Sequence, residues 1–205
     1  MSRRIVIGIT GASGVQYAIR LLDVLNGHVE THLIISEQGR EIIEYETDTP
    51  VDRVIKKATF YHDDGDFMAP VASGSYRWDS MVIVPCTMKT LSSIATGFAD
   101  TLISRAADVT LKESRRLIIV PREMPLNLVH LENMVKVKQA GAVVMPACPG
   151  FYNKPQTIDD LVDNVVGRIL DQAGIDNDIF QRWGEPVKKK STLPTSSTKI
   201  RKGKQ

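Results

Sequence analysis

The sequence runs Leu117-Ile118-Ile119-Val120-Pro121-Arg122-Glu123-Met124-Pro125 at the centre of its most informative region. The four apolar residues are typical of a buried strand, and the apolar spacing at 102–111 just before them predicts a helix. Arg122 and Glu123 would then lie where the strand ends, and the flanking prolines restrict the backbone there. In open parallel sheets, ligands bind at the carboxyl ends of the strands. A cation and a carboxylate are therefore predicted side by side in a ligand-binding crevice.

On both sides of this stretch, short apolar runs alternate with longer segments of helical periodicity. Such alternation is typical of βαβ units that build a parallel sheet. We predict strands at 4–9, 30–35, 60–62, 81–84, 117–120 and 142–145, and helices at 15–25, 38–45, 52–58, 91–97, 102–111, 126–140 and 158–173. The predicted fold class is α/β, with a three-layer, Rossmann-like or flavodoxin-like parallel sheet that has helices on both faces. The stretch 63–76 is predicted to be a long loop, either a binding loop or plain irregular structure.

Length and composition indicate one folded domain with a charged end. A chain of 205 residues, 42% of them hydrophobic, is long enough for one well-buried α/β domain, which we place at 1–186. The remaining 187–205 is polar and lacks periodicity, so it is predicted to be a disordered tail. Seven basic residues lie in that tail, and without them the chain has 19 basic against 24 acidic residues. Because no aromatic residues are interleaved with these charges, we expect no specific nucleic-acid partner.

The sequence shows no targeting or membrane signal. The apolar run 5–9 is too short for a secretory leader, and no apolar stretch is long enough to span a membrane. Cys86 and Cys148 are too few for a disulfide framework, and their spacing matches no metal site. We therefore expect a reduced, cytoplasmic protein without a bound metal.

Two turns that follow predicted strands have the chemistry of phosphate cradles. Gly11-Ala12-Ser13-Gly14 follows the strand at 4–9, where glycines let backbone amides approach a phosphate at a helix N-terminus. The spacing departs from G-x-G-x-x-G and gives no evidence for a dinucleotide. Ser13 alone could simply cap the next helix, but its position favours contact with a phosphate or a flavin. Thr87-Met88-Lys89-Thr90 follows the strand at 81–84 and is the second candidate cradle.

Further polar and basic residues lie at strand ends or on helices. Ser36 and Tyr152 follow predicted strands. Arg105, Asp108 and Lys112 share one helix face, and for that helix alone a solvated face with an Asp108–Lys112 ion pair is the simpler interpretation. The cations of the predicted site are Arg105, Lys112, Arg122 and Arg168. Their number exceeds what one helix face needs and suits a phosphorylated cofactor plus a second anion. These patterns do not name the reaction.

A series of short sequence blocks indicates the reaction through resemblance to a known family. The blocks, in order, are Thr10-Gly11-Ala12-Ser13-Gly14, Glu46-Thr47-Asp48, Met68-Ala69-Pro70 with Ala72-Ser73-Gly74-Ser75, Arg105-Ala106-Ala107-Asp108-Val109, Leu111-Lys112-Glu113, Pro121-Arg122-Glu123, His130-Leu131-Glu132-Asn133-Met134, Pro149-Gly150-Phe151-Tyr152, Asp160-Leu161-Val162 and Arg182-Trp183-Gly184-Glu185. They closely resemble the UbiX-type flavin prenyltransferases, and the likeness covers about 4–185. One tetrapeptide would be weak evidence, whereas this many blocks in one order are strong evidence.

The resemblance implies transfer of a dimethylallyl group from dimethylallyl phosphate to N5 and C6 of reduced FMN, without a metal. The product, prenylated FMN, would serve a UbiD-type decarboxylase, and the family implies a homo-oligomer, typically a dodecamer with active sites at subunit junctions. By position, the implied FMN contacts are Gly11, Ala12, Ser13, Ser36, Thr87, Met88, Lys89, Thr90 and Arg122. The implied substrate contacts are Tyr152, Arg168, Lys112, Phe67 and Arg105, the last from a neighbouring subunit. The implied catalytic residues are Glu123, Glu46, Ser13, Lys112 and Trp183.

The chemistry of an allylic phosphate agrees with this assignment. Its ionisation leaves an anion and a cation, so basic groups stabilise the departing phosphate while a carboxylic acid protonates it. Glu123, next to Arg122, is the predicted acid. An aromatic wall of Phe67, Tyr152 and Trp183 would exclude water and offer the cation a π face.

Two alternative functions stay open at this point. Flavin-dependent cysteine decarboxylases share a related fold, but where they carry a Pro-Ala-Ser-Ala-Asn-Thr block this chain has Pro85-Cys86-Thr87-Met88-Lys89-Thr90. A non-catalytic flavin carrier would need no second, cationic pocket, and Lys112, Arg122 and Arg168 argue against it.

Overall fold

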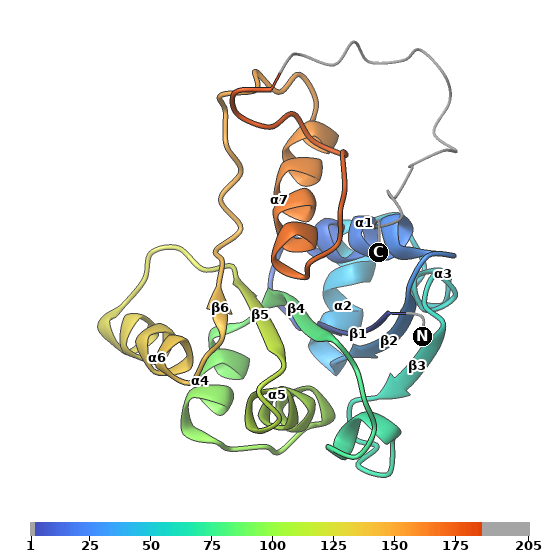
Figure 1. The fold of residues 1–205 in the computed structure, drawn as a ribbon, viewed down its shortest axis with the longest axis vertical. Coiled ribbons are helices and arrows are strands. Elements are labelled where there is room, and N and C mark those ends of the chain that lie inside the picture. The colour runs from blue at the N-terminus through green and yellow to red at the C-terminus, as the bar shows by residue number, and fades with distance from the viewer. Residues whose placement is uncertain (1–2, 186–205) are drawn as a thin grey trace, which may run out of the picture.

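The computed structural model describes residues 3–185, through which a six-stranded parallel sheet runs (Figure 1). Its strands are β1 (Arg4–Ile9), β2 (Glu30–Ile35), β3 (Phe60–Asp63), β4 (Ser80–Cys86), β5 (Arg116–Pro121) and β6 (Val143–Val144). They lie in the order β3-β2-β1-β4-β5-β6, and all neighbours are parallel. The chain therefore moves outward from β1 to β3 and returns to the other side of β1 at β4. This is the doubly wound Rossmann order, and the predicted fold class is confirmed.

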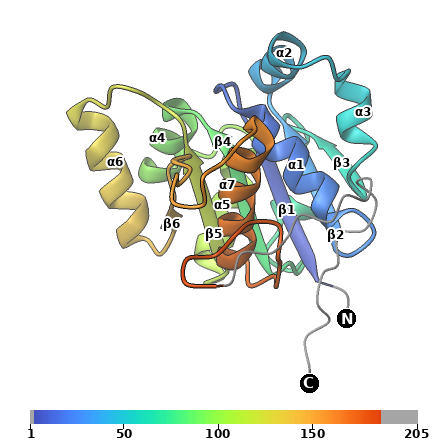
Figure 2. The same ribbon diagram turned by 90° about the horizontal axis from the view of Figure 1, so that it is seen from above.

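Helices cover both faces of the sheet (Figure 2). They are α1 (Val15–Leu25), α2 (Glu37–Glu46), α3 (Val51–Ile55), α4 (Met88–Thr96), α5 (Leu102–Lys112), α6 (Leu128–Gln139) and α7 (Ile158–Gln172), with a short 3-10 helix η1 (Pro70–Ala72). The core residues of α1, α2, α3 and α7 belong to one apolar cluster, and those of α4, α5 and α6 belong to a second. Each cluster fills the space between the sheet and the helices on one of its faces, so the domain has three layers.

The alternation of side chains along the central strands produces these two clusters. In β1, Ile5 and Ile7 lie in the cluster that contains α1 and α7, whereas Val6 lies in the cluster that contains α5. Successive side chains of a strand point to opposite faces, so a strand that is covered on both faces needs an unbroken apolar run. In β5 the same rule places Ile118 with α7 and Ile119 with α5.

Most predicted element boundaries agree with the structure. The first strand and the first helix have the predicted ends. Helix α4 begins at Met88, earlier than the predicted 91, because Thr87 caps it. The predicted strand at 142–145 is shorter, since β6 covers only Val143–Val144. The predicted tail, 187–205, lies outside the described residues.

Candidate active site

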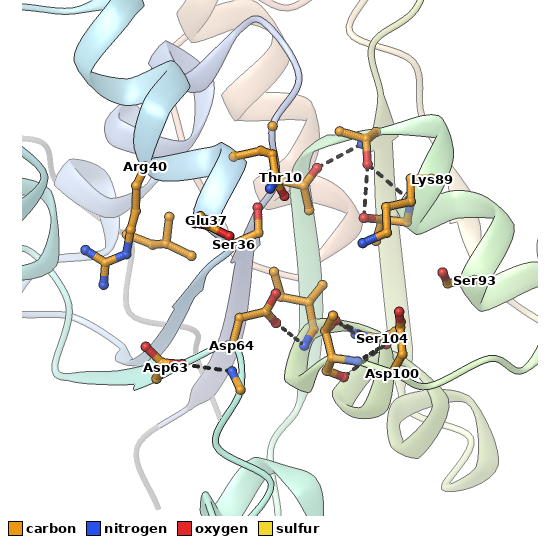
Figure 3. A pocket seen from close by; sticks show the side chains of 18 residues that line it. Thr10, Ser36, Glu37, Arg40, Asp63, Asp64, Lys89, Ser93, Asp100 and Ser104 are labelled. Carbon is orange, nitrogen blue, oxygen red and sulfur yellow. Dashed lines mark hydrogen bonds between the residues drawn. The ribbon is translucent and has the colours of Figure 1, made fainter.

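A cavity of about 780 Å³ opens at the carboxyl ends of β1, β2 and β4 (Figure 3). It lies where the strand order reverses between β1 and β4, which is where doubly wound folds bind their ligands. Its volume suits a ligand of cofactor size. Five of the predicted FMN contacts line it, namely Gly11, Ser36, Thr87, Lys89 and Thr90. Met88 does not line it, because its side chain packs against the apolar cluster of α5.

Three helix N-termini meet at this cavity. Ser36 caps α2, Thr87 caps α4 and Thr101 caps α5, each by accepting a hydrogen bond from the backbone amide three residues later, at 3.0, 3.2 and 3.3 Å respectively. A helix N-terminus carries free amides and the positive end of the helix dipole. The first turn of α4 also carries Lys89 and has no acidic residue. The N-terminus of α4 is therefore the strongest anion site that the cavity offers.

The buried hydroxyl of Thr10 joins the two candidate cradles. Its Oγ1 donates to the carbonyl of Pro85 at 2.8 Å and accepts from the amide of Thr87 at 2.8 Å. These bonds fix the end of β1 against the end of β4, so the Gly11 turn and the Thr87 turn keep a constant separation. Thr10 was not predicted as a site residue, because its hydrogen bonds join positions that are 75 and 77 residues apart.

Gly11 permits the close approach of the first turn to α2. A Cβ atom at this position would fall well inside the van der Waals distance of the Gln38 Cβ. Any side chain here would push the Gly11 turn away from the start of α2, where Ser36 lies. The glycine therefore brings two predicted FMN contacts to the same wall of the cavity.

Glu46 lies against the same turn, although it is far away in sequence. Its Oε2 accepts a hydrogen bond of 2.8 Å from the backbone amide of Gly14, which is 32 residues earlier. Gly14 has φ of 101° and is the N-cap of α1, so Ser13 does not cap that helix as one interpretation of the sequence allowed. Ala12 and Ser13 complete the turn but do not line the cavity.

The opposite wall of the cavity is acidic and was missed by the sequence analysis. Asp63, Asp64 and Asp100 line it. The carboxylate of Asp64 accepts from the amide of Ile103 at 2.9 Å and so occupies the N-terminus of α5. Burial raises the pKa of Asp64, and the Ile103 amide partly opposes that rise. This wall repels a phosphate and leaves the N-terminus of α4 as its binding place.

Arg122 and Glu123 lie directly after β5, as predicted. The amide of Arg122 donates to the carbonyl of Cys86 at 3.3 Å, which ties the end of β5 to the end of β4. The carboxylate of Glu123 accepts from the amide of Met124 at 3.0 Å. Both residues are exposed, and neither lines the cavity in the single chain.

Tyr152 and Trp183 form an aromatic pair beside α7. Their ring centroids are 5.4 Å apart with an interplanar angle of 82°, and the Tyr152 hydroxyl donates to the carbonyl of Gln181 at 3.3 Å. Trp183 is 80% exposed in the single chain. Arg168, on α7, is exposed and lies 3.6 Å from the carboxylate of Asp171.

Arg105, Lys112 and Phe67 lie on another part of the surface, away from the cavity lining. Arg105 pairs with Asp108 at 2.7 Å, and Lys112 pairs with Glu113 at 2.6 Å. The predicted Asp108–Lys112 ion pair is therefore wrong, because Asp108 pairs with Arg105, which lies one turn earlier in the helix. Phe67 is 46% exposed. The single chain thus brings five predicted FMN contacts together and leaves the predicted substrate contacts on two other surfaces.

Two further features concern residues 3–185. None of the helices in this part of the chain is long and apolar enough to cross a membrane. The same residues contain no group of three or more His, Cys, Asp or Glu that could hold a metal ion.

Comparison with known proteins identifies the class. The sequence pattern of the Flavoprotein family matches residues 1–170. A protein of Methanocaldococcus jannaschii named flavin prenyltransferase UbiX is 54% identical over 181 residues, which are 88% of this chain and 98% of that protein. The chain is therefore a flavoprotein, and it belongs to the UbiX flavin prenyltransferases.

Solved structures agree with this assignment. One is described as AnUbiX (PadA1) in complex with FMN and dimethylallyl pyrophosphate; it is 48% identical, has a TM-score of 0.89, and the match covers 91% of this chain and all of that one. A second is a dodecameric FMN-dependent UbiX-like decarboxylase from Escherichia coli O157:H7. It is 45% identical with a TM-score of 0.87, and the match covers 89% of this chain and all of that one.

Proposed function

We propose that this chain transfers a dimethylallyl group from dimethylallyl phosphate to N5 and C6 of reduced FMN, and so makes prenylated FMN. The observation that carries the proposal is the cavity at the β1–β4 switch point, where the capped N-terminus of α4 and Lys89 favour a phosphate. A second set of cations and aromatic residues lies outside this cavity. We propose that this second set binds the prenyl phosphate while the cavity binds FMN.

The residues of the cavity fit the phosphate end of FMN. Thr87, Thr90 and Lys89 would bind it at the N-terminus of α4, with Ser36 on the neighbouring α2. The acidic wall at Asp64 would keep the phosphate from the other end of the cavity. Bound there, reduced FMN supplies the nucleophilic ring positions of the reaction.

A second group of residues would hold and activate the prenyl phosphate. Arg168 and Tyr152 bind the phosphate, and Glu123 protonates it as its bond to the allylic carbon breaks. The electrons of that bond would leave with the phosphate, and the allylic carbon would bond to N5, which loses its proton. Protonation of the remaining prenyl double bond would then give the tertiary cation that C6 attacks, and C6 would lose its proton as the new ring closes. Tyr152 and Trp183, already in edge contact, form the aromatic wall that shields the cationic carbon from water. Glu46 accepts the proton that the flavin loses, with Ser13 beside it.

The active site is proposed to be completed by a neighbouring copy of the chain. Arg105 and Lys112 lie seven residues apart, on one face of α5, and do not line the cavity of their own chain. Exposed apolar residues mark a surface through which copies can meet, namely Met124, Leu126, Leu128, Val129, Leu131 and Val135. Leu128, Leu131 and Val135 form one stripe along α6. We propose a homo-dodecamer that carries Arg105 and Lys112 into the site of an adjacent subunit.

The product would be consumed by a UbiD-type decarboxylase, which uses prenylated FMN as its cofactor. We place the protein in the cytoplasm, a reducing compartment in which free thiols such as those of Cys86 and Cys148 persist. Between the two alternative functions, neither a cysteine decarboxylase nor a flavin carrier accounts for relatives near 50% identity that are named flavin prenyltransferases.

The test is the mass of the flavin after anaerobic incubation of the FMN-loaded protein with a reductant and dimethylallyl phosphate. We expect a flavin that is heavier by one isoprene unit, with release of inorganic phosphate. A parallel incubation with dimethylallyl diphosphate tells the two donors apart. An unchanged flavin mass in a folded, FMN-loaded protein with both donors would overturn the proposal.

A further inference from the structure

Asp171, near the end of α7, holds the last described segment of the chain in place. We call residues 174–185 the C-terminal segment; it runs back along α7 toward the loop that precedes this helix (Figure 1). Arg182 of this segment donates two hydrogen bonds to the Asp171 carboxylate, at 2.8 and 2.7 Å. Asn177 donates a third, at 3.0 Å. Charge-assisted, two-point contacts of this kind fix direction as well as distance.

Packing and charge show that the contact is a specific one. Gly167 faces the ring of Phe180 so closely that a Cβ atom there could not fit. The guanidinium of Arg182 lies 4.8 Å from the centroid of the same ring. The hydrogen bond to Asp171 raises the pKa of Arg182. The C-terminal segment therefore rests on α7 in one defined position.

The same carboxylate also contacts a predicted substrate residue. Arg168 lies one turn before Asp171, and its Nη1 is 3.6 Å from the Asp171 Oδ2. Asn164, one further turn back, accepts a hydrogen bond of 3.0 Å from the amide of Gly150, next to the Tyr152 loop. Residues 164, 168 and 171 share a face of α7, because they are spaced by four and three. One face of α7 thus carries Arg168 and contacts both the loop that holds Tyr152 and the segment that holds Trp183.

We propose that Asp171 is a positioning residue for the prenyl-phosphate part of the site. It orients Arg168 toward the phosphate and, through Arg182, holds Trp183 against Tyr152. This inference rests on the proposed function, because it assigns Arg168 and Trp183 to the substrate. FMN binding takes place at the cavity between β1 and β4, so it does not depend on Asp171.

The chain offers a closely matched control on the same helix. Asp163 receives two hydrogen bonds from Arg20 on α1, at 2.6 and 3.3 Å, and both carboxylates are about one-fifth exposed. Asp163→Asn removes the same charge from α7 and breaks a similar ion pair. It leaves the C-terminal segment and Arg168 untouched.

The experiment compares steady-state kinetics of wild type, Asp171→Asn, Asp171→Glu and Asp163→Asn. In Asp171→Asn we expect KM for dimethylallyl phosphate to rise about tenfold, as the loss of one charge-assisted contact predicts, with FMN affinity unchanged. Asp171→Glu should recover part of the loss, and Asp163→Asn should behave as wild type. Arg168→Ala should raise KM too, and adding Asp171→Asn should raise it by much less than tenfold more. A KM in Asp171→Asn within twofold of wild type, or an equal rise in Asp163→Asn, would overturn the inference.

Hydrogen exchange separates this inference from the proposed function. In the FMN-loaded protein, the amides of 174–185 should exchange faster in Asp171→Asn than in wild type, and no faster in Asp163→Asn. If wild type makes no heavier flavin, the proposed function fails on its own. Unchanged exchange of 174–185 in Asp171→Asn would refute the positioning role, whatever the activity.

Discussion

The Glu46 carboxylate accepts a 2.8 Å hydrogen bond from the backbone amide of Gly14 and so joins the end of α2 to the first turn of the fold. This bond fixes one carboxylate oxygen against the turn that also carries Ser13. The hydrogen bond gives this carboxylate a defined position, which the proton transfer that we propose for it requires.

Glu46→Gln should fold and bind FMN but form prenylated FMN slowly. Glutamine can still accept from the Gly14 amide, whereas it cannot take up a proton, so turnover should fall by roughly a hundredfold or more. Glu46→Ala should lose the anchor as well, which we expect to cost about 1–3 kcal/mol of stability. Single-turnover rates and thermal melts measure the two effects. Equal turnover in wild type and Glu46→Gln would remove Glu46 from proton transfer.

Glu123→Gln should retain FMN and lose turnover. This variant lacks the carboxylic acid that we propose protonates the departing phosphate, and general acid catalysis contributes on the order of a hundredfold or more. The matched control is Glu41→Gln, an exposed carboxylate on α2, which should be fully active. Wild-type phosphate release in Glu123→Gln would show that another group or water supplies the proton.

Acid should destabilise the fold through a pair of histidines, one buried and one half-buried. His32 Nδ1 and His62 Nε2 are 2.9 Å apart, and His32 also contacts Glu30 and Tyr76. Burial lowers the pKa of both histidines, and for His62 the neighbouring His32 lowers it further. The charges that face the pair, Glu30, Arg4 and Asp66, do not reverse this direction.

The sign of the pH effect follows from these lowered values. Below the ordinary histidine pKa of 6.5, the unfolded chain binds protons that the folded chain does not. The stability that depends on the neutral histidines is therefore fully present above that pH and is lost as the pH falls. The free energy of unfolding decreases by up to about 1.4 kcal/mol per pH unit for each proton taken up. Thermal melts of His62→Gln should show a weaker pH dependence than wild type. An identical dependence would exclude this pair as its source.

The apolar stripe on α6 should control assembly. Leu131 is 46% exposed in the single chain, and Leu131→Glu would bury an unpaired carboxylate if copies meet there. We expect a smaller species in light scattering, with prenylated FMN formation reduced because Arg105 and Lys112 no longer reach a neighbouring site. Glu41→Lys, on α2, is the control and should leave the mass unchanged. A full-size Leu131→Glu assembly would place the contact elsewhere.

Patterns local in sequence predicted the fold well. The apolar runs of β1, β4 and β5 are long because both faces of those strands are covered, so the existence of each strand could be predicted from pattern. The ends of β1 were predicted correctly, whereas β4 and β5 extend beyond the predicted 81–84 and 117–120, to Ser80–Cys86 and Arg116–Pro121. The cradles at Gly11 and at Thr87 could be predicted for the same reason, since each follows such a strand. The short length of β6 could not be predicted, because the extent of this strand is limited by its pairing with β5 and not by the type of its side chains.

Contacts that join distant positions were not predictable from pattern. The Asp64 carboxylate at the N-terminus of α5 joins positions 39 residues apart, and no spacing rule connects them. Glu46 was assigned to the flavin turn only through the family resemblance, and alone it would have been taken for a surface carboxylate. The role we give to Asp171 depends on an ion pair with Arg182 that only the folded chain shows.

The central claim is that one active site joins a phosphate cradle from one chain to basic residues from another. Two single variants test it most directly, Lys112→Ala and Glu123→Gln, each purified, then dissociated and reassembled together. Neither alone should make prenylated FMN at an appreciable rate, whereas mixed assemblies should, because some junctions then combine an intact Lys112 with an intact Glu123. Mixed assemblies that form but remain as inactive as either parent would contradict the account.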